Sequence, residues 1–159
     1  MRLVVSISKQ TLTVLNAQNE VLVHYFISTA VNGAGCEKNS GCTPLGKHMI
    51  RAKIGGGAPV GSVFVGRRPT GEIFTSALMK EFPNRDWILT RILWLSGTEV
   101  GVNRLGNVDT MQRYIYIHGT PDSNVMGVIG SHGCVRMRNA EIIDLFDMVD
   151  VGAEVDIQP

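Results

Sequence analysis

YIHGTPDSNVMGVIGSHGCVRM, residues 116–137, contains two of the four histidines and one of the three cysteines of the chain. Alternating residues over 113–117 predict a strand that leads into His118, and the glycine-rich segment that follows brings a thiol close to a base. A thiol attacks a carbonyl carbon only as thiolate, so it needs a nearby imidazole to take its proton. We therefore predict that Cys134 is a nucleophile and that His118 is its general base.

The residues around the thiol suit attack on an amide. Such an attack creates an oxyanion, and the compact turn Ser131-His132-Gly133-Cys134 is able to aim backbone N–H groups at one point. Arg136 carries a planar fork of donors that suits a carboxylate, and Arg91, Arg67 and Arg68 are further candidates for that role.

Composition predicts one mainly β domain over residues 1–159. The chain has 44% hydrophobic residues, 18 glycines and a formal charge of +1. A balanced charge argues against nucleic acid as a partner. No apolar run reaches the roughly 20 residues that span a bilayer, so we expect no membrane segment.

Patterning predicts strands at 2–14 and 20–28, joined as a hairpin, and at 47–54, 62–66, 87–95 and 113–117. Residues 73–82 fit either a strand or a short helix, and 67–71 resemble a turn. After the motif, Ile142, Leu145 and Val149 recur at helical spacing, so one packed helix is expected, with Asn139 as its N-cap and Gly152 as its end. Residues 154–157 are predicted to be a last edge strand.

The N-terminus and the cysteines predict a compartment. The first residues turn polar before a signal-peptide core can form, so we expect a cytoplasmic protein, or a periplasmic one if Met1 is not the natural start. Three cysteines are an odd number, and thiols stay free in a reducing compartment. The spacing of Cys36 and Cys42 fits neither a redox pair nor a zinc knuckle, so incidental loop thiols are the simplest interpretation.

The motif resembles the signature of the L,D-transpeptidase catalytic domain, the YkuD-like family. The resemblance rests on YIHGT at 116–120, on SHGCVRM at 131–137 and on a Thr-Pro-x-Gly turn at 43–46, and it covers nearly the whole chain. It implies a YkuD-like β-sandwich or barrel-like fold. By this resemblance Cys134 is the nucleophile, His118 the base and the Gly119 carbonyl the group that orients the base. His132, Gly133, Ser131 and Arg136 would form the oxyanion and substrate site.

The resemblance also implies a substrate and a reaction. Family members form a thioester with peptidoglycan stem peptides at the bond before a D-alanine, and they need no metal or cofactor. An amine acceptor gives a cross-link or an exchanged D-amino acid, whereas water releases D-alanine. Short unexported relatives resemble this chain better, so we predict an L,D-carboxypeptidase that trims recycled tetrapeptides or muropeptides. Acylation of the thiol by carbapenems is expected.

Several alternatives stay open. In the simplest alternative, Cys134 is a buried structural thiol. In another, His118, His132 and Cys134 bind zinc, although their spacing is unusual for zinc ligands. A third is an L,D-transpeptidase, and a fourth is an inactive domain that binds wall fragments. The sequence leaves the oligomeric state and the preferred muropeptide undetermined.

Overall fold

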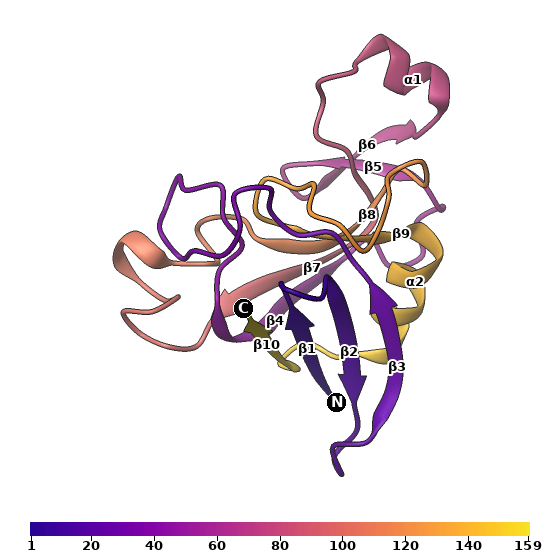
Figure 1. The fold of residues 1–159 in the computed structure, drawn as a ribbon. Helices are drawn as coiled ribbons and strands as arrows, with labels where there is room; N and C mark the ends of the chain where they lie inside the picture. The colour runs from indigo at the N-terminus through magenta and orange to yellow at the C-terminus, as the bar shows by residue number, and fades with distance from the viewer.

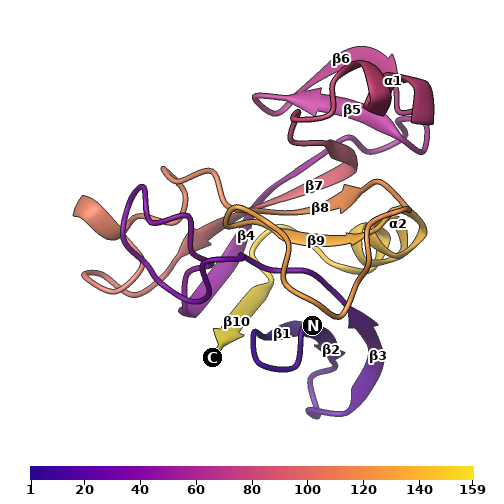
Figure 2. The same ribbon diagram turned by 45° about the horizontal axis from the view of Figure 1, so that its top comes forward.

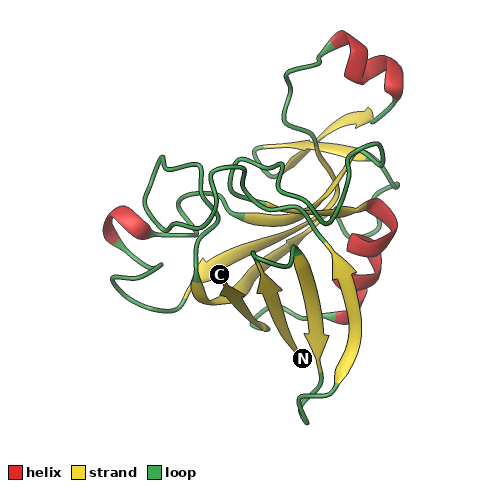
Figure 3. Ribbon diagram, viewed as in Figure 1, coloured by secondary structure: helices red, strands yellow, loops and turns green.

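The computed structural model describes residues 1–159, and its main feature is one curved ten-stranded sheet (Figure 1). The strands are β1 Arg2–Ser6, β2 Thr11–Leu15, β3 Val21–Phe26, β4 Gly46–Ile54, β5 Ser62–Val65, β6 Arg68–Ile73, β7 Ile88–Gly97, β8 Tyr116–Thr120, β9 Val135–Arg138 and β10 Glu154–Gln158. The helices are α1 Ser76–Glu81, the short 3-10 helix η1 Gly106–Val108, and α2 Asn139–Met148. Figure 3 shows the helices at the periphery of the sheet. The predicted mainly β, barrel-like fold is confirmed.

The sheet branches at β7. Its strands run in the order β3-β2-β1-β10-β4-β7-β5-β6, and β8 pairs with both β7 and β9. A register shift between Leu89 and Ile92 interrupts the pairing of β7 with β8. Figure 2 shows the result, with β8 and β9 beside β7 and the β5–β6 hairpin at one end of the molecule. The branch places β8 and β9 side by side as a parallel pair, with the first residues of β8 opposite the first residues of β9.

The main hydrophobic core lies between the strands and α2. It is built from alternate residues of the strands and from one face of the helix, because alternate side chains of a strand point to the same side of a sheet. Members with no exposed surface include Leu3, Val5, Ile117, Val135, Met137, Ile142 and Leu145. Helix α2 packs against β7, β8 and β9. None of the helices is long and apolar enough to cross a lipid bilayer.

The predicted helix after the motif exists, but its cap is different. Arg138 occupies the N-cap position, and no side chain caps the helix. Asn139 is the first helical residue, and its buried amide donates instead to the Thr120 carbonyl at 2.9 Å and to Asp122 Oδ1 at 3.1 Å. The side chain is therefore used to tie the helix to the end of β8. The helix ends at Met148 rather than near Gly152.

Four further local predictions were wrong in detail. Residues 2–14 are not one strand but two antiparallel strands, β1 and β2, with residues 7–10 as the turn between them. Residues 68–71 are not a turn but part of β6, which tolerates Pro69 because an edge strand leaves one side unpaired. Residues 154–158 are not an edge strand, because β10 lies between β1 and β4. The predicted strand 113–117 begins only at Tyr116, because a turn precedes it. The ambiguous segment 73–82 ends in the short helix α1.

Candidate active site

Parallel pairing of β8 with β9 sets the positions of the predicted nucleophile and base. Ile117 pairs with Val135 and His118 with Arg136. Ile117 and Val135 are fully buried in the core, so their neighbours face the opposite side of the sheet. His118, Cys134 and Arg136 all line one cavity on that side. The structure therefore brings together three residues that are up to 18 positions apart in the sequence.

His118 is held in one tautomer. Its Nδ1 lies 2.7 Å from the Gly119 carbonyl oxygen, which only accepts hydrogen bonds, so Nδ1 carries the proton and Nε2 has a free lone pair. Only 1% of His118 is exposed, and this burial lowers the pKa of its imidazole below the ordinary value of 6.5. The imidazole is therefore neutral at physiological pH and able to take a proton.

Gly119 has no room for a side chain. A Cβ at this position would lie 2.6 Å from the Leu89 carbonyl oxygen and 2.5 Å from Asn139 Oδ1. The chain therefore needs a glycine at the residue whose carbonyl orients His118. The predicted role of Gly119 fits this geometry.

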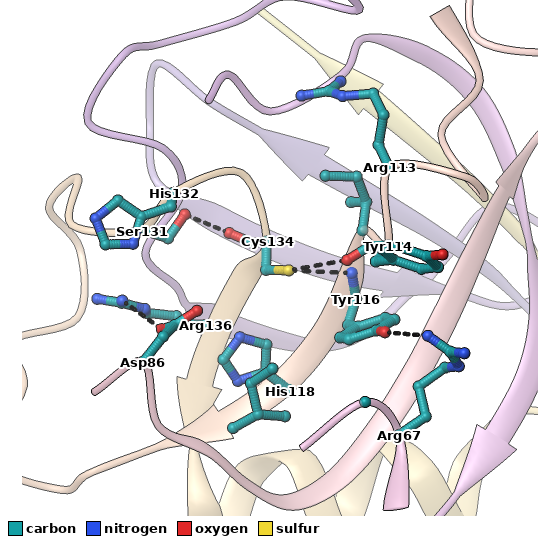
Figure 4. A pocket seen from close by; sticks show the side chains of 13 residues that line it. Arg67, Asp86, Arg113, Tyr114, Tyr116, His118, Ser131, His132, Cys134 and Arg136 are labelled. Atoms are coloured by element: carbon teal, nitrogen blue, oxygen red, sulfur yellow. Dashed lines mark hydrogen bonds and ion pairs between the residues drawn. The ribbon is translucent and has the colours of Figure 1, made fainter. Parts of the chain in front are cut away.

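Cys134 has two backbone contacts that hold its sulfur. Its Sγ donates to the Tyr114 carbonyl at 3.5 Å and accepts from the Tyr116 N–H at 3.3 Å (Figure 4). Burial raises the pKa of the thiol to about 12 from its ordinary value of 9, and the Tyr116 N–H offsets only part of this effect. Cys134 and His118 thus rest as a neutral thiol and a neutral imidazole rather than as an ion pair.

The turn before Cys134 is fixed by its own hydrogen bonds. The Ser131 hydroxyl donates to the Cys134 carbonyl and accepts from the Gly133 N–H at 3.2 Å. The predicted Gly133 donor is therefore already paired, whereas the Cys134 N–H donates to no protein group. His132 is exposed and lines the cavity. In this turn the Cys134 N–H is the better oxyanion donor.

Thr43, from the Thr-Pro-x-Gly turn, fastens this loop from a distance. Its hydroxyl donates to the Gly133 carbonyl at 2.9 Å and accepts from the Ala30 N–H at 3.0 Å. Thr43 is fully buried. The second motif of the sequence thereby holds the residue that precedes the thiol.

Arg136 lines the cavity, but two of its three guanidinium nitrogens already donate to protein groups. Its guanidinium donates to the Gly130 carbonyl at 2.7 Å and to Asp86 Oδ1 at 3.2 Å. Its Nε is buried without a partner. A substrate carboxylate would have to compete with Asp86 for this side chain.

The cavity around the sulfur has a volume of about 530 Å³. Figure 4 shows Arg67 and Tyr116 on one side of Cys134, and Asp86 with Arg136 on the other. The cavity is also lined by Arg67, which the sequence suggested, and by Arg113, Tyr114 and Asp86, to which the sequence assigned no role. Asp86 comes from the loop before β7, and Arg113 and Tyr114 come from the turn before β8, so no spacing pattern marked them as one site. Only Tyr116, inside the motif, had a local signal.

The structure excludes the zinc alternative and places the other two cysteines away from the cavity. No three His, Cys, Asp or Glu side chains lie close enough together to hold a metal ion, so His118, His132 and Cys134 do not form the alternative zinc site. Cys36 and Cys42 are free and lie outside the cavity. The Cys36 sulfur accepts from the Leu45 N–H at 3.3 Å, a local contact within its loop.

Comparison with known proteins gives one family. The family model described as YkuD, L,D-transpeptidase catalytic domain, matches residues 1–157. No curated protein gives a significant match. An L,D-transpeptidase from Mycobacterium smegmatis superimposes with a TM-score of 0.58 at 22% identity, over 99% of this chain and 58% of that one.

Two other solved structures carry β-lactams. An L,D-transpeptidase in complex with imipenem has a TM-score of 0.56 at 23% identity, over 98% of this chain and 57% of that one. L,D-transpeptidase 3 from Mycobacterium tuberculosis, with a faropenem-derived adduct, has a TM-score of 0.55 at 17% identity, over 99% of this chain and 59% of that one. At these identities the likeness shows the fold, and the chain spans less than two thirds of each structure.

Proposed function

Because the chain belongs to the YkuD family of L,D-transpeptidase catalytic domains, we propose that it is a cysteine-dependent L,D-carboxypeptidase. Its substrate is a peptidoglycan-derived tetrapeptide or muropeptide, from which it releases the terminal D-alanine. The observation that carries the proposal is the neutral pair of Cys134 and His118 in a cavity lined by three arginines.

The first half-reaction forms a thioester. His118 Nε2 takes the thiol proton as Cys134 Sγ bonds to the carbonyl carbon before D-alanine, and the Cys134 N–H is placed to stabilise the oxyanion. The carbon–nitrogen bond then breaks, and the imidazolium gives its proton to the departing amine. The Gly119 carbonyl stabilises the imidazolium that exists between these steps.

The second half-reaction returns the enzyme to its resting state. His118 takes a proton from water, whose oxygen bonds to the thioester carbon, and the carbon–sulfur bond breaks. The released thiolate recovers its proton from the imidazolium. The products are the tripeptide, with a new carboxyl group, and free D-alanine.

The charges of the cavity support a substrate with a free carboxylate. Arg67, Arg113 and Arg136 line it against a single acidic side chain, Asp86. Its volume of about 530 Å³ is in the range of sites for one small ligand. A tetrapeptide that ends in a carboxylate matches this excess of positive charge.

A transpeptidase is the second candidate, and the description of the family favours it. In that reaction an amine takes the place of water. An incubation distinguishes the two functions. The protein is incubated with a disaccharide or UDP-linked tetrapeptide, with and without a D-amino acid such as D-methionine, and the products are identified by mass spectrometry. Net loss of D-alanine supports the carboxypeptidase, whereas exchange without net loss supports the transpeptidase.

The Cys134→Ala variant is the control for both activities. It removes the sulfur but leaves the loop bonds of Ser131 and Thr43 in place. We expect it to fold and to release no D-alanine. An active Cys134→Ala variant would refute the assignment of the nucleophile.

Acylation by a carbapenem separates an enzyme from an inactive wall-binding domain. We extend to this chain what the solved relatives with imipenem and with a faropenem-derived adduct indicate for themselves. Intact-mass analysis after incubation with imipenem should show one adduct in the wild type and none in Cys134→Ala. An unmodified wild type would favour the inactive domain.

The proposal includes a cytoplasmic role in peptidoglycan recycling. All three cysteines are free thiols, which a reducing compartment maintains. Loss of the protein should then cause soluble tetrapeptides to accumulate in the cytoplasm, where cell fractionation should also find the protein. Recovery of the protein from the periplasm would contradict this part of the proposal.

A further inference from the structure

Five arginines stand near the site or were candidates for binding a substrate carboxylate, and their contacts distinguish them. Arg136 is occupied by Asp86 and by a carbonyl. Arg113 lines the cavity, but it donates to the Cys42 carbonyl at 2.6 Å and to the Gly35 carbonyl at 3.2 Å. Both therefore hold loops of the protein together.

Two of the other arginines are not in the cavity. Arg91 is 8% exposed and donates to the carbonyls of Ala58, at 2.9 Å, and Thr90, at 2.7 Å. Arg68 is exposed at the start of β6 and does not line the cavity. This leaves Arg67.

Arg67 reaches the cavity from an unusual backbone conformation. Val65 pairs with Arg68, so Gly66 and Arg67 form a two-residue hairpin turn, and their φ values are 56° and 65°. Such a turn needs positive φ at both central residues and normally uses asparagine, aspartate or glycine there. An arginine at this position is conformationally unfavourable, and unfavourable residues of this kind concentrate at functional sites.

The guanidinium of Arg67 is held in place without being neutralised. It donates to the Tyr116 hydroxyl at 3.0 Å, and its central carbon lies 4.5 Å from the Trp94 ring centroid and 4.9 Å from that of Tyr114. These are cation–π distances. No carboxylate pairs with Arg67, and its Nε and Nη2 donate to no protein group. A positioned pair of donors remains open to a ligand.

Tyr116 contacts both the Arg67 guanidinium and the Cys134 sulfur. The backbone N–H of Tyr116 contacts Cys134 Sγ, and its hydroxyl contacts Arg67. The thiol and the guanidinium thus contact opposite ends of the same tyrosine residue, at 3.3 Å and 3.0 Å. One extended residue of substrate spans roughly 3.5 Å, so a single residue after the attacked carbonyl extends along Tyr116 from the sulfur toward Arg67, which lines the same cavity.

We propose that Arg67 binds the C-terminal carboxylate of the substrate and so makes the enzyme select peptides that end one residue after the scissile bond. The inference rests on the proposed function, because it names the group that recognises the departing D-alanine. Arg67 acts in binding and leaves the thiol chemistry to Cys134 and His118. Arg136, paired with Asp86, then shapes the opposite side of the cavity.

The test compares Arg67→Gln, Arg67→Lys and Arg68→Gln on two substrates. One is the tetrapeptide with a free terminal carboxylate, and the other is the same peptide with a terminal carboxamide. Glutamine keeps a long polar side chain at this turn position but lacks the positive charge of arginine. Arg68→Gln removes an equal charge from the next residue, outside the cavity, and serves as the matched control.

Arg67→Gln should lose roughly tenfold to a hundredfold in kcat/KM on the carboxylate substrate, mainly through KM, which is the effect of removing a charge-assisted bidentate contact. It should change little on the carboxamide. Arg67→Lys should fall between, and Arg68→Gln should match the wild type on both substrates. Equal losses on both substrates, or no loss on the carboxylate, would overturn the inference.

Alkylation by iodoacetamide gives a readout that does not depend on turnover of the carboxamide. The reagent carries no carboxylate, and mass analysis of the peptide containing Cys134 follows its rate. Arg67→Gln should react at the wild-type rate. A rate that falls as far as kcat/KM would mean that Arg67 acts on the thiol through Tyr116, which contradicts a binding role. If the wild type releases no D-alanine at all, it is the proposed function that fails.

Discussion

Replacing Thr43 with valine should weaken both the fold and the site, because one hydroxyl satisfies two buried backbone groups. The Gly133 carbonyl, 2.9 Å away, and the Ala30 N–H, 3.0 Å away, would lose their partner. A buried polar group left unsatisfied costs about 1–3 kcal/mol, so the two together cost roughly 2–6 kcal/mol. Valine keeps the shape of threonine, so the loss comes from hydrogen bonding. Total stabilities are typically about 5–15 kcal/mol, so the change is large.

Urea unfolding measures this loss, and Thr43→Ser is the matched control. Serine keeps the hydroxyl and removes one methyl group, worth about 0.8 kcal/mol. Because Gly133 precedes Cys134, the valine variant should also release D-alanine more slowly, while the serine variant stays close to the wild type. If the valine and serine variants unfold at the same urea concentration, the hydroxyl does not hold the loop.

Three further predictions follow from burial. Gly119→Ala should destabilise the protein and abolish most activity, because its Cβ would lie 2.6 Å from the Leu89 carbonyl oxygen; thermal unfolding and D-alanine release test this. The acid limb of kcat/KM should lie below pH 6.5, because burial lowers the pKa of His118; a limb centred above 6.5 contradicts a buried neutral base. Burial also lowers the pKa of His48 to about 4, so the unfolded state binds the proton more tightly. The free energy of unfolding should therefore include a contribution from His48 of about 3 kcal/mol above pH 6.5, which is lost as the pH falls to 4. Urea unfolding of the wild type and of His48→Gln at both pH values measures this contribution.

The sequence predicted the chemistry of the site better than its surroundings. Cys134 and His118 lie in one contiguous motif, and parallel pairing of the two strands at its ends brings them together. Arg67, Asp86 and Arg113 come from three separate loops, and only the folded sheet makes them neighbours. Their meeting depends on the branch at β7, which leaves no pattern of spacing in the sequence.

Errors in the fold prediction arose where a residue type has two uses. Pro69 and Gly71 usually mark a turn, yet the edge position of β6 accepts both. Asn139 is a common helix cap, but here its amide is used to bind the end of β8. In each case tertiary contacts outweighed the local preference of the residue. Sequence patterns alone do not report such contacts.

The neutral resting state gives the site a form of selectivity. Because burial raises the pKa of the Cys134 thiol to about 12, the thiol stays protonated at pH 7. The sulfur is therefore a poor nucleophile toward electrophiles that only collide with it. A peptide whose carbonyl oxygen reaches the Cys134 N–H stabilises the developing charge at the moment when His118 takes the proton. Reactivity then depends on a correctly bound substrate, so a group that binds it, such as Arg67, raises kcat/KM without acting on the thiol itself.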